Sequence, residues 1–301
     1  MYPASMSRME PADVGGLLDR VFKMYLGNFA QMIGTLAIVY VPYVALTMFW
    51  QRVLMQKENV GGVLIGALGV LSFGLVFMPL AMGATTYAVS ERYLGRRISI
   101  GQSYSRASSR LGAIVGAGLL VGLIVAVGCF LCCVPGILFL LSYAVVIPVV
   151  VLDGLGVTES MERSKALADG QRGRLFLVLL VLWILTAILQ FGGLFASVMI
   201  GGRPQPGQSA PLSGEVIQHI VGLLTGPLGT IAAVIIYFDL RVRKEGFDLE
   251  MLSRAMSPTL AIPLPGAPQP PPGAWQQPPP GAWQPPQPPP GPPQPPQGPT
   301  F

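Results

Sequence analysis

The most constraining feature of this chain is an apolar stretch, residues 111–152, that carries no charged side chain. A single helix of these 42 residues would be about 63 Å long at about 1.5 Å per residue, which is about twice the 30 Å hydrocarbon core of a bilayer. The stretch is therefore predicted to form two membrane-spanning helices. The turn between them is predicted at Cys133 to Gly136, which contains a Pro-Gly pair, and Asp153 closes the second helix.

Four further apolar runs are long enough to cross a membrane. They are predicted at about Phe29–Trp50, within Val60–Val89, at about Leu175–Ile200 and at about Val216–Phe238. Charged residues make up only 11% of the chain, against about 25% in soluble domains. The predicted fold class is all-α, a polytopic membrane protein with six transmembrane helices arranged as three hairpins. Residues 1–16 contain no apolar segment, so we expect no cleavable signal peptide.

A short amphipathic helix is predicted before each pair of spans. The first covers residues 13–28 and the third covers residues 158–168, where Thr158 is the predicted cap. The second follows Ser99, which has capping-box spacing to Gln102. Basic residues lie near all three, so we expect them to lie in the cytoplasmic membrane interface; a packing helix is the alternative for the first. The pattern suggests three repeats of an interfacial helix followed by a helical hairpin.

The basic residues are distributed unequally across the six predicted spans. Sixteen of the 19 Lys and Arg residues fall on one side, and the other side holds Arg52, Lys57 and Arg203. Because Lys and Arg are enriched in cytoplasmic loops, this asymmetry predicts that both termini are cytoplasmic in a plasma or inner membrane. Five or seven spans would remove the asymmetry, so the distribution also supports the number six.

The last predicted span ends in a dense group of charges. Asp239 with Arg243, and Arg241 with Glu245, have the i,i+4 spacing of helical ion pairs, so the helix is predicted to continue beyond the membrane. Gly246 can adopt the left-handed conformation that ends a helix. An ordinary span end held by basic residues explains these charges, and a ligand site is the alternative.

Two short segments carry a recognisable pattern. Its residues are Arg163, Ser164, Leu167 and Gly170 in the first segment and Tyr237, Asp239, Leu240, Arg241, Arg243, Lys244, Glu245, Gly246, Phe247 and Asp248 in the second. The pattern resembles the signatures of the glycerophosphodiesterase membrane domain family, which is related to uncharacterised multi-spanning proteins of the YciC type. Lys165 and Asp169 depart from it, standing where the family has Trp and Lys. The resemblance extends over about residues 10–252 and implies an architecture; the phosphodiesterase domain that gives the family its name has no counterpart here.

The C-terminal part of the chain is rich in proline. Residues 257–301 hold 20 of the 30 prolines, and the sequence PPPGAWQ occurs twice. We expect a disordered tail with polyproline II character. A cytosolic partner with an aromatic groove could bind it through Trp275 and Trp283, and a linker without a fixed partner is the alternative. The predicted organisation is a cytoplasmic N-terminus with an amphipathic helix, a six-span membrane domain, a charged helical extension and the tail, at residues 1–28, 29–238, 239–256 and 257–301.

Residues with catalytic or metal-binding chemistry are scarce. Cys129, Cys132 and Cys133 lie together without a nearby His, Asp or Glu, so we expect packing rather than a metal site, with a redox pair as the alternative. His219 is the sole histidine and lies one turn after Glu215, which suggests an interfacial contact. No nucleotide-binding motif is present. The sequence therefore predicts no catalytic, cofactor-binding or metal-binding residues, no cofactor and no nucleic-acid partner.

These observations favour a membrane protein without enzymatic activity that organises membranes or acts as a scaffold, with membrane lipids as its immediate partners. The alternative is a transporter or lipid-handling protein. A central cavity lined by Gln190 and intramembrane threonines such as Thr225 would favour that alternative, whereas the same residues could form hydrogen bonds between helices.

Overall fold

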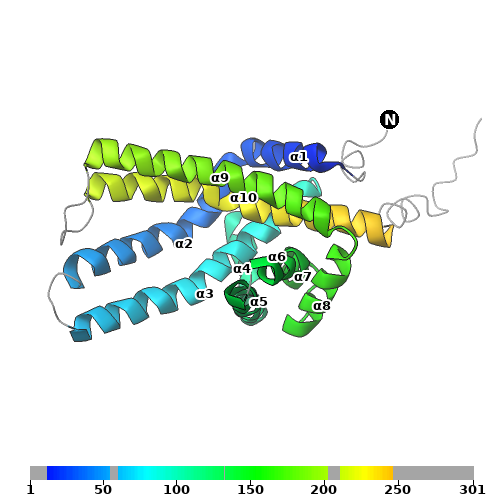
Figure 1. Cartoon of the computed structure of the whole chain (residues 1–301), viewed down its shortest axis with the longest axis horizontal. Coiled ribbons are helices and arrows are strands. Elements are labelled where there is room, and N and C mark those ends of the chain that lie inside the picture. The colour runs from blue at the N-terminus through cyan, green and yellow to red at the C-terminus, as the bar shows by residue number, and fades with distance from the viewer. Residues whose placement is uncertain (1–11, 55–59, 132, 203–210, 247–301) are drawn as a thin grey trace, which may run out of the picture. The chain divides into compact units, whose positions relative to one another are not determined.

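The computed structural model of this protein describes residues 12–54, 60–131, 133–202 and 211–246. Within these residues the regular secondary structure is helical, and no strand is found (Figure 1). The elements are α1 (Val14–Gly27), α2 (Phe29–Phe49), the π-helix η2 (Trp50–Leu54), α3 (Val60–Tyr93), α4 (Ile100–Ser108), α5 (Leu111–Leu131), α6 (Cys133–Ser142), α7 (Val146–Leu152), α8 (Val157–Ala168), α9 (Arg172–Gly201) and α10 (Leu212–Glu245). The predicted proline-rich tail, with Trp275 and Trp283, lies outside the described residues, as do Phe247 and Asp248.

Six segments of the described residues are long and apolar enough to cross a membrane. They are Phe29–Arg52, Gly61–Tyr93, Leu111–Leu131, Cys133–Leu152, Arg172–Gly201 and Leu212–Glu245. This confirms the all-helical class and the number of candidate spans, and it fits an integral membrane protein. The predicted turn at Cys133–Gly136 is misplaced, because α6 begins at Cys133 and Pro135 lies in its first turn, where its missing N–H is not needed. The third candidate span ends at Leu131, so the fourth begins slightly before the predicted turn would allow. Within the fourth candidate span the chain bends at residues 143–145, between α6 and α7.

The buried core lies near the charged ends of the long helices. Apart from Gly214, the buried residues of α10 fall between Thr225 and Val242. Those of α9 lie mostly in its first three turns, from Leu175 to Leu182. One cluster joins α10, α9, α7 and α1, and it contains the completely buried Tyr237. Packing between these helices is therefore concentrated at one end of the bundle.

The opposite halves of the same helices expose large apolar side chains. Ile65 of α3 is 72% exposed and Ile200 of α9 is 70% exposed. Further exposed apolar residues of these halves are Leu64, Leu68, Leu71, Ile188, Phe191, Phe195 and Met199. An apolar surface this continuous is unstable in water, so it requires an apolar environment such as lipid.

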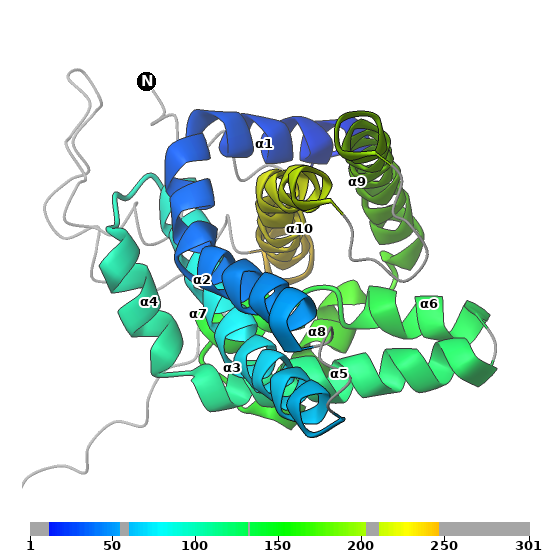
Figure 2. The same ribbon diagram turned by 90° about the vertical axis from the view of Figure 1, so that its left-hand side faces the viewer.

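The α5–α6 hairpin runs in a different direction from α9 and α10. Figure 1 looks almost along α5, while α9 and α10 lie in the plane of the picture. In Figure 2, after a 90° turn, α5 and α6 lie side by side in the plane and α10 is seen nearly end-on. A flat membrane crossed by α9 and α10 would not be crossed by α5 and α6 in this arrangement. The three-hairpin, six-span topology therefore stays a prediction.

The three short predicted helices are present as α1, α4 and α8. The Asp13 side chain caps α1 by accepting from the Gly16 N–H at 2.8 Å, and Ser99 forms the predicted capping box with Gln102 at the start of α4. The predicted cap Thr158 is wrong, because α8 begins at Val157. Its first turn is closed by Glu159, whose carboxylate accepts from the Gly156 N–H at 3.1 Å.

Each of these short helices turns apolar residues towards the protein. Leu17 and Val21 of α1 are buried in the core shared with α10, and Met161 and Leu167 of α8 are also buried. Tyr104 of α4 donates its hydroxyl to the Thr35 carbonyl of α2 at 2.6 Å. Burial raises the pKa of Tyr104 to about 12, so it remains a donor at neutral pH. Packing against the long helices therefore holds all three in place, and their position in a membrane interface stays a prediction.

Candidate functional site

The two segments that carry the family pattern meet at the charged end of the bundle. Arg163 of α8 and Glu245 of α10 form an ion pair with 2.8 Å between Nη2 and Oε1. Lys244 also reaches α8, donating from Nζ to the Ala166 carbonyl at 2.6 Å. Residues that are about 80 positions apart in the sequence therefore form one site, and the sequence pattern did not show this contact.

The first charged group, the Asp153 cluster, consists of Asp153, Arg163, Tyr237, Arg241 and Glu245. Asp153 accepts from Arg163 Nε at 2.7 Å and from the Tyr237 hydroxyl at 2.6 Å. Arg241 lies 2.9 Å from Glu245 Oε2 and 3.7 Å from Asp153 Oδ1. The hydrogen bond to Asp153 raises the pKa of Arg163 above its ordinary value. Two carboxylates thus face two guanidinium groups, so the cluster carries no net charge.

The second group, the Asp239 cluster, ties the start of α1 to the end of α10. The Asp239 side chain is only 2% exposed and accepts from Arg174 Nη1 at 2.7 Å and Arg243 Nε at 2.9 Å. It also accepts from the Ala12 N–H at 3.0 Å. Both arginines donate their second nitrogen to the Ala12 carbonyl. A buried carboxylate is stable only when paired and hydrogen-bonded, and Asp239 meets both conditions.

The other residues of the family pattern support this packing. Ser164 is buried and donates to the Ser142 carbonyl at 3.1 Å, and Leu167 is buried in the main core. Gly170 has φ +74° and Gly246 has φ +57°, conformations that favour glycine at chain turns. The prediction for Gly246 as the helix end is confirmed, and so are the pairs of Asp239 with Arg243 and Arg241 with Glu245.

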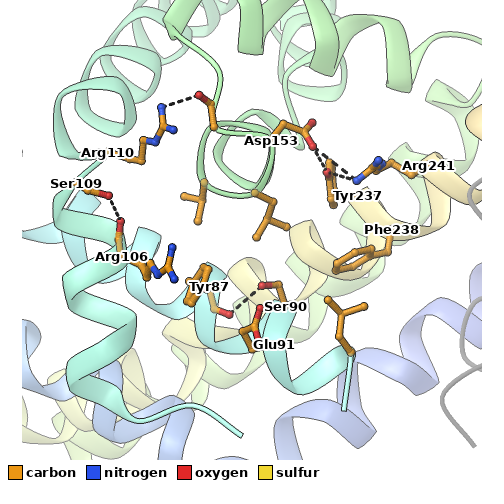
Figure 3. Close-up of a pocket in the computed structure, with 14 residues that line it drawn as sticks. Tyr87, Ser90, Glu91, Arg106, Ser109, Arg110, Asp153, Tyr237, Phe238 and Arg241 are labelled. Carbon is orange, nitrogen blue, oxygen red and sulfur yellow. Dashed lines mark hydrogen bonds and ion pairs between the residues drawn. The ribbon is translucent and has the colours of Figure 1, made fainter. Parts of the chain in front are cut away.

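A cavity of about 510 Å³ lies next to the Asp153 cluster (Figure 3). Its walls come from α3, α4, α7 and α10 and from the chain segments that follow α3, α4 and α7. The lining includes three arginines, Arg106, Arg110 and Arg241, and two carboxylates, Glu91 and Asp153. Figure 3 shows Arg106 and Arg110 along one side and Asp153, Tyr237 and Arg241 along the other.

The intramembrane polar residues considered for a transport path bond to one another. Gln190 of α9 donates to the Thr225 hydroxyl at 3.0 Å and accepts from Gln218 at 2.9 Å. Both partners belong to α10. These contacts are therefore hydrogen bonds between helices, which the sequence suggests as the alternative to a transport path. The sequence predicts that Glu215 contacts His219. In the structure the Glu215 carboxylate forms an ion pair with Arg52, with 2.9 Å between the two groups.

No group of three or more His, Cys, Asp or Glu that could hold a metal ion is found among the described residues. Cys129 and Cys133 are free thiols at the tip of the α5–α6 hairpin. Cys132 lies outside the described part of the chain. The expected packing role does not fit these two side chains well, since both are exposed.

Sequence reasoning missed three participants in the two clusters. The sequence indicates Asp153 only as the end of an apolar run, counts Arg174 only among the sixteen basic residues of one side, and gives no indication of Ala12. A signal did exist for Asp153, because a lone carboxylate at a span end needs a basic partner. No sequence pattern distinguishes the backbone of Ala12, whose role depends entirely on tertiary contact.

Comparison with known proteins found no match to any family model, any curated protein or any solved structure. The resemblance to the glycerophosphodiesterase membrane domain family therefore stays a prediction based on the two short segments.

Proposed function

We propose that this chain is a multi-pass protein of the cell membrane, with both termini cytoplasmic, that organises the membrane or acts as a scaffold without enzymatic activity. In this proposal six helices cross the membrane as three hairpins, and α1, α4 and α8 lie on its cytoplasmic side. Membership of the family of YciC-like membrane proteins is part of the proposal, since that resemblance implies the same architecture.

The observation that carries the proposal is that five charged residues of the family pattern, Arg163, Asp239, Arg241, Arg243 and Glu245, are held in ion pairs within the protein. General acid–base catalysis needs a carboxylate, histidine or similar group free to exchange a proton with a substrate. Asp239 instead accepts three hydrogen bonds within the protein, and Asp153 and Glu245 are each paired with arginines. These contacts support a structural role for the pattern, in which it fixes α1, α8 and α10 together.

The scaffold role makes a prediction about the proline-rich tail. If Trp275 and Trp283 anchor it in an aromatic groove, a cytosolic protein should be crosslinked to the full chain in native membranes. We expect that protein to be lost when the chain ends at Met256 and also when both tryptophans are replaced by alanine. Crosslinking followed by affinity purification and mass spectrometry measures both.

The matched control replaces Gln276 and Gln284 by alanine, one in each copy of PPPGAWQ. It alters the same repeats without removing an aromatic ring, so the partner should remain. A partner list that is identical for the full chain and for the chain ending at Met256 would contradict a scaffold role of the tail.

A transporter or lipid-handling protein is the second candidate. The contacts of Gln190 with Thr225 and Gln218 use the polar groups that a transport path would need. The cavity beside the Asp153 cluster favours lipid handling, because it combines arginines with apolar walls at the ends of apolar helices.

A further inference from the structure

The cavity beside the Asp153 cluster has an excess of positive charge. Its two carboxylates are already paired with arginines outside its lining: Glu91 lies 3.6 Å from Arg96, and Asp153 lies 2.7 Å from Arg163. Within the part of the chain that the structure describes, Arg241 is the only one of its three arginines that is paired with carboxylates. The other two, Arg106 and Arg110, are therefore the source of the excess charge.

Neither Arg106 nor Arg110 contacts a carboxylate among the described residues. The Arg106 guanidinium lies 5.9 Å from the centroid of the Tyr87 ring. Arg110 donates from Nη1 to the Gly154 carbonyl at 2.6 Å. An aromatic face and a carbonyl orient a guanidinium without neutralising it. Both side chains are thus held at the cavity with donors left for an anion (Figure 3).

The remaining walls of the cavity are partly apolar. Leu94, Leu152 and Phe238 belong to its lining. Arg110 directly precedes α5, whose 21 residues contain no charge, so the arginines lie where an apolar helix begins. A cavity with cationic and apolar sides at the end of an apolar helix suits an amphiphile with an anionic head.

We propose that this cavity binds a phosphate group, with Arg106 and Arg110 as its ligands, and that the phosphate belongs to the headgroup of an anionic phospholipid. Arginine is suited to this task because its planar guanidinium presents several donors to phosphate oxygens. The apolar walls would receive the part of the lipid next to the headgroup. The proposal is independent of the scaffold role of the tail, since it uses none of the tail residues.

The test measures binding of phosphatidylglycerol to the full chain, purified in detergent, by native mass spectrometry. The variant Arg106→Gln/Arg110→Gln should lose about tenfold or more in affinity, because each basic residue near an anionic lipid strengthens binding by about fivefold. The matched control is Arg97→Gln/Lys165→Gln. It removes the same charge from two exposed residues outside the cavity, so its affinity should change less than about twofold.

Three results would overturn the proposal. The double variant could bind phosphatidylglycerol like the unchanged chain, the control could lose as much affinity as the double variant, or neutral phosphatidylcholine could bind equally well. If the double variant does not fold, the affinity of the single variant Arg106→Gln for phosphatidylglycerol is measured in its place. The Arg106 side chain makes no hydrogen bond within the described residues, so its loss should leave folding intact. An unchanged affinity in that single variant would also count against the site.

A competition experiment identifies the source of the phosphate. With a lipid as ligand, millimolar inorganic phosphate should leave phosphatidylglycerol bound. Displacement by inorganic phosphate that depends on Arg106 and Arg110 would retain the phosphate site and contradict the assignment to a lipid. The scaffold experiment on the tail would be unaffected by either result.

Discussion

At the scale of single residues, Asp239 is the only charged residue that is buried among the described residues. It accepts hydrogen bonds from two arginines and one backbone N–H while almost completely buried. Two guanidinium groups share this one carboxylate, so its charge is needed to hold both of them in place. Through Ala12, Arg174 and Arg243, this one carboxylate links the start of α1 to α9 and α10.

We expect Asp239→Asn to destabilise the protein by about 3–5 kcal/mol, because breaking a buried ion pair leaves Arg174 and Arg243 without their carboxylate. Unfolding of the purified protein in detergent, followed by circular dichroism, measures the change. The control is Asp19→Asn, which removes the exposed i,i+4 pair with Lys23 and should cost less than about 1 kcal/mol. Equal losses in the two variants would show that Asp239 has no special role.

The glycine at position 136 allows α5 and α6 to lie close together in their hairpin. A Cβ atom on Gly136 would lie 2.2 Å from Cys129 Sγ and 2.7 Å from the Cys129 backbone nitrogen. Similarly, Cβ atoms added to Gly222 and Gly226 of α10 would lie too close to Tyr40 and Leu36 of α2. At these positions the absence of a side chain is what allows the helices to touch.

At the scale of elements, the α5–α6 hairpin is the part whose membrane position is least constrained by sequence. The charge asymmetry of the loops would be the same if this hairpin did not cross, because both of its ends lie on the same side and it carries no charge. Figure 2 shows it running across α10. Yet α5 is about 31 Å long from its 21 residues, which matches the hydrocarbon core of a bilayer.

We expect the hairpin to cross the membrane, because its surface is apolar on all sides and an interfacial helix needs a polar face. At its tip Phe130 is 92% exposed and Leu131 is 75% exposed. Cys129 and Cys133, which lie near this tip, should therefore react with a membrane-impermeant maleimide added to right-side-out membrane vesicles. No engineered cysteine is needed, since the three cysteines of the chain all fall within residues 129–133.

The control for this labelling replaces the three cysteines by serine and introduces Ser105→Cys on the exposed face of α4. That thiol should react only after the vesicles are permeabilised. If the native cysteines also require permeabilisation, the hairpin does not cross, and its direction in Figure 2 describes its position in the membrane as well.

At the scale of the whole molecule, the charged clusters and the main buried core lie at the same end of the helix bundle. Among the described residues, Arg163, Arg174 and Arg243 form ion pairs at the end where α1, α7, α9 and α10 contribute to the main buried cluster. The opposite halves of α3 and α9 expose apolar side chains and gain little from contact with other helices. We infer that protein contacts stabilise the charged end of the bundle and that lipid contacts stabilise the other end.

The charge asymmetry predicts that both termini lie in the cytoplasm. Green fluorescent protein fused to either terminus should therefore fluoresce, and alkaline phosphatase fused at the same positions should be inactive. A fusion of alkaline phosphatase within residues 203–210, between the fifth and sixth spans, is the internal control and should be active. Active phosphatase at either terminus would exclude the six-span topology with cytoplasmic ends.

The sequence by itself determined the class of this protein, the number of candidate spans, the short helices between them and the continuation of α10 to Gly246. These features depend on local composition and periodicity, which can be read along the chain. Most helix boundaries followed for the same reason, whereas the start of α8 was missed because the side chain that closes its first turn is Glu159 rather than Thr158.

Only the tertiary structure decided which charges meet. Arg163 and Glu245, or Ala12 and Asp239, are far apart in the sequence, and their contact results from the packing of apolar helix faces that bring them together. The cavity formed by α3, α4, α7 and α10 is a property of the same packing. Local patterns place a charge at a helix end, but the partner of that charge depends on the direction of every helix around it.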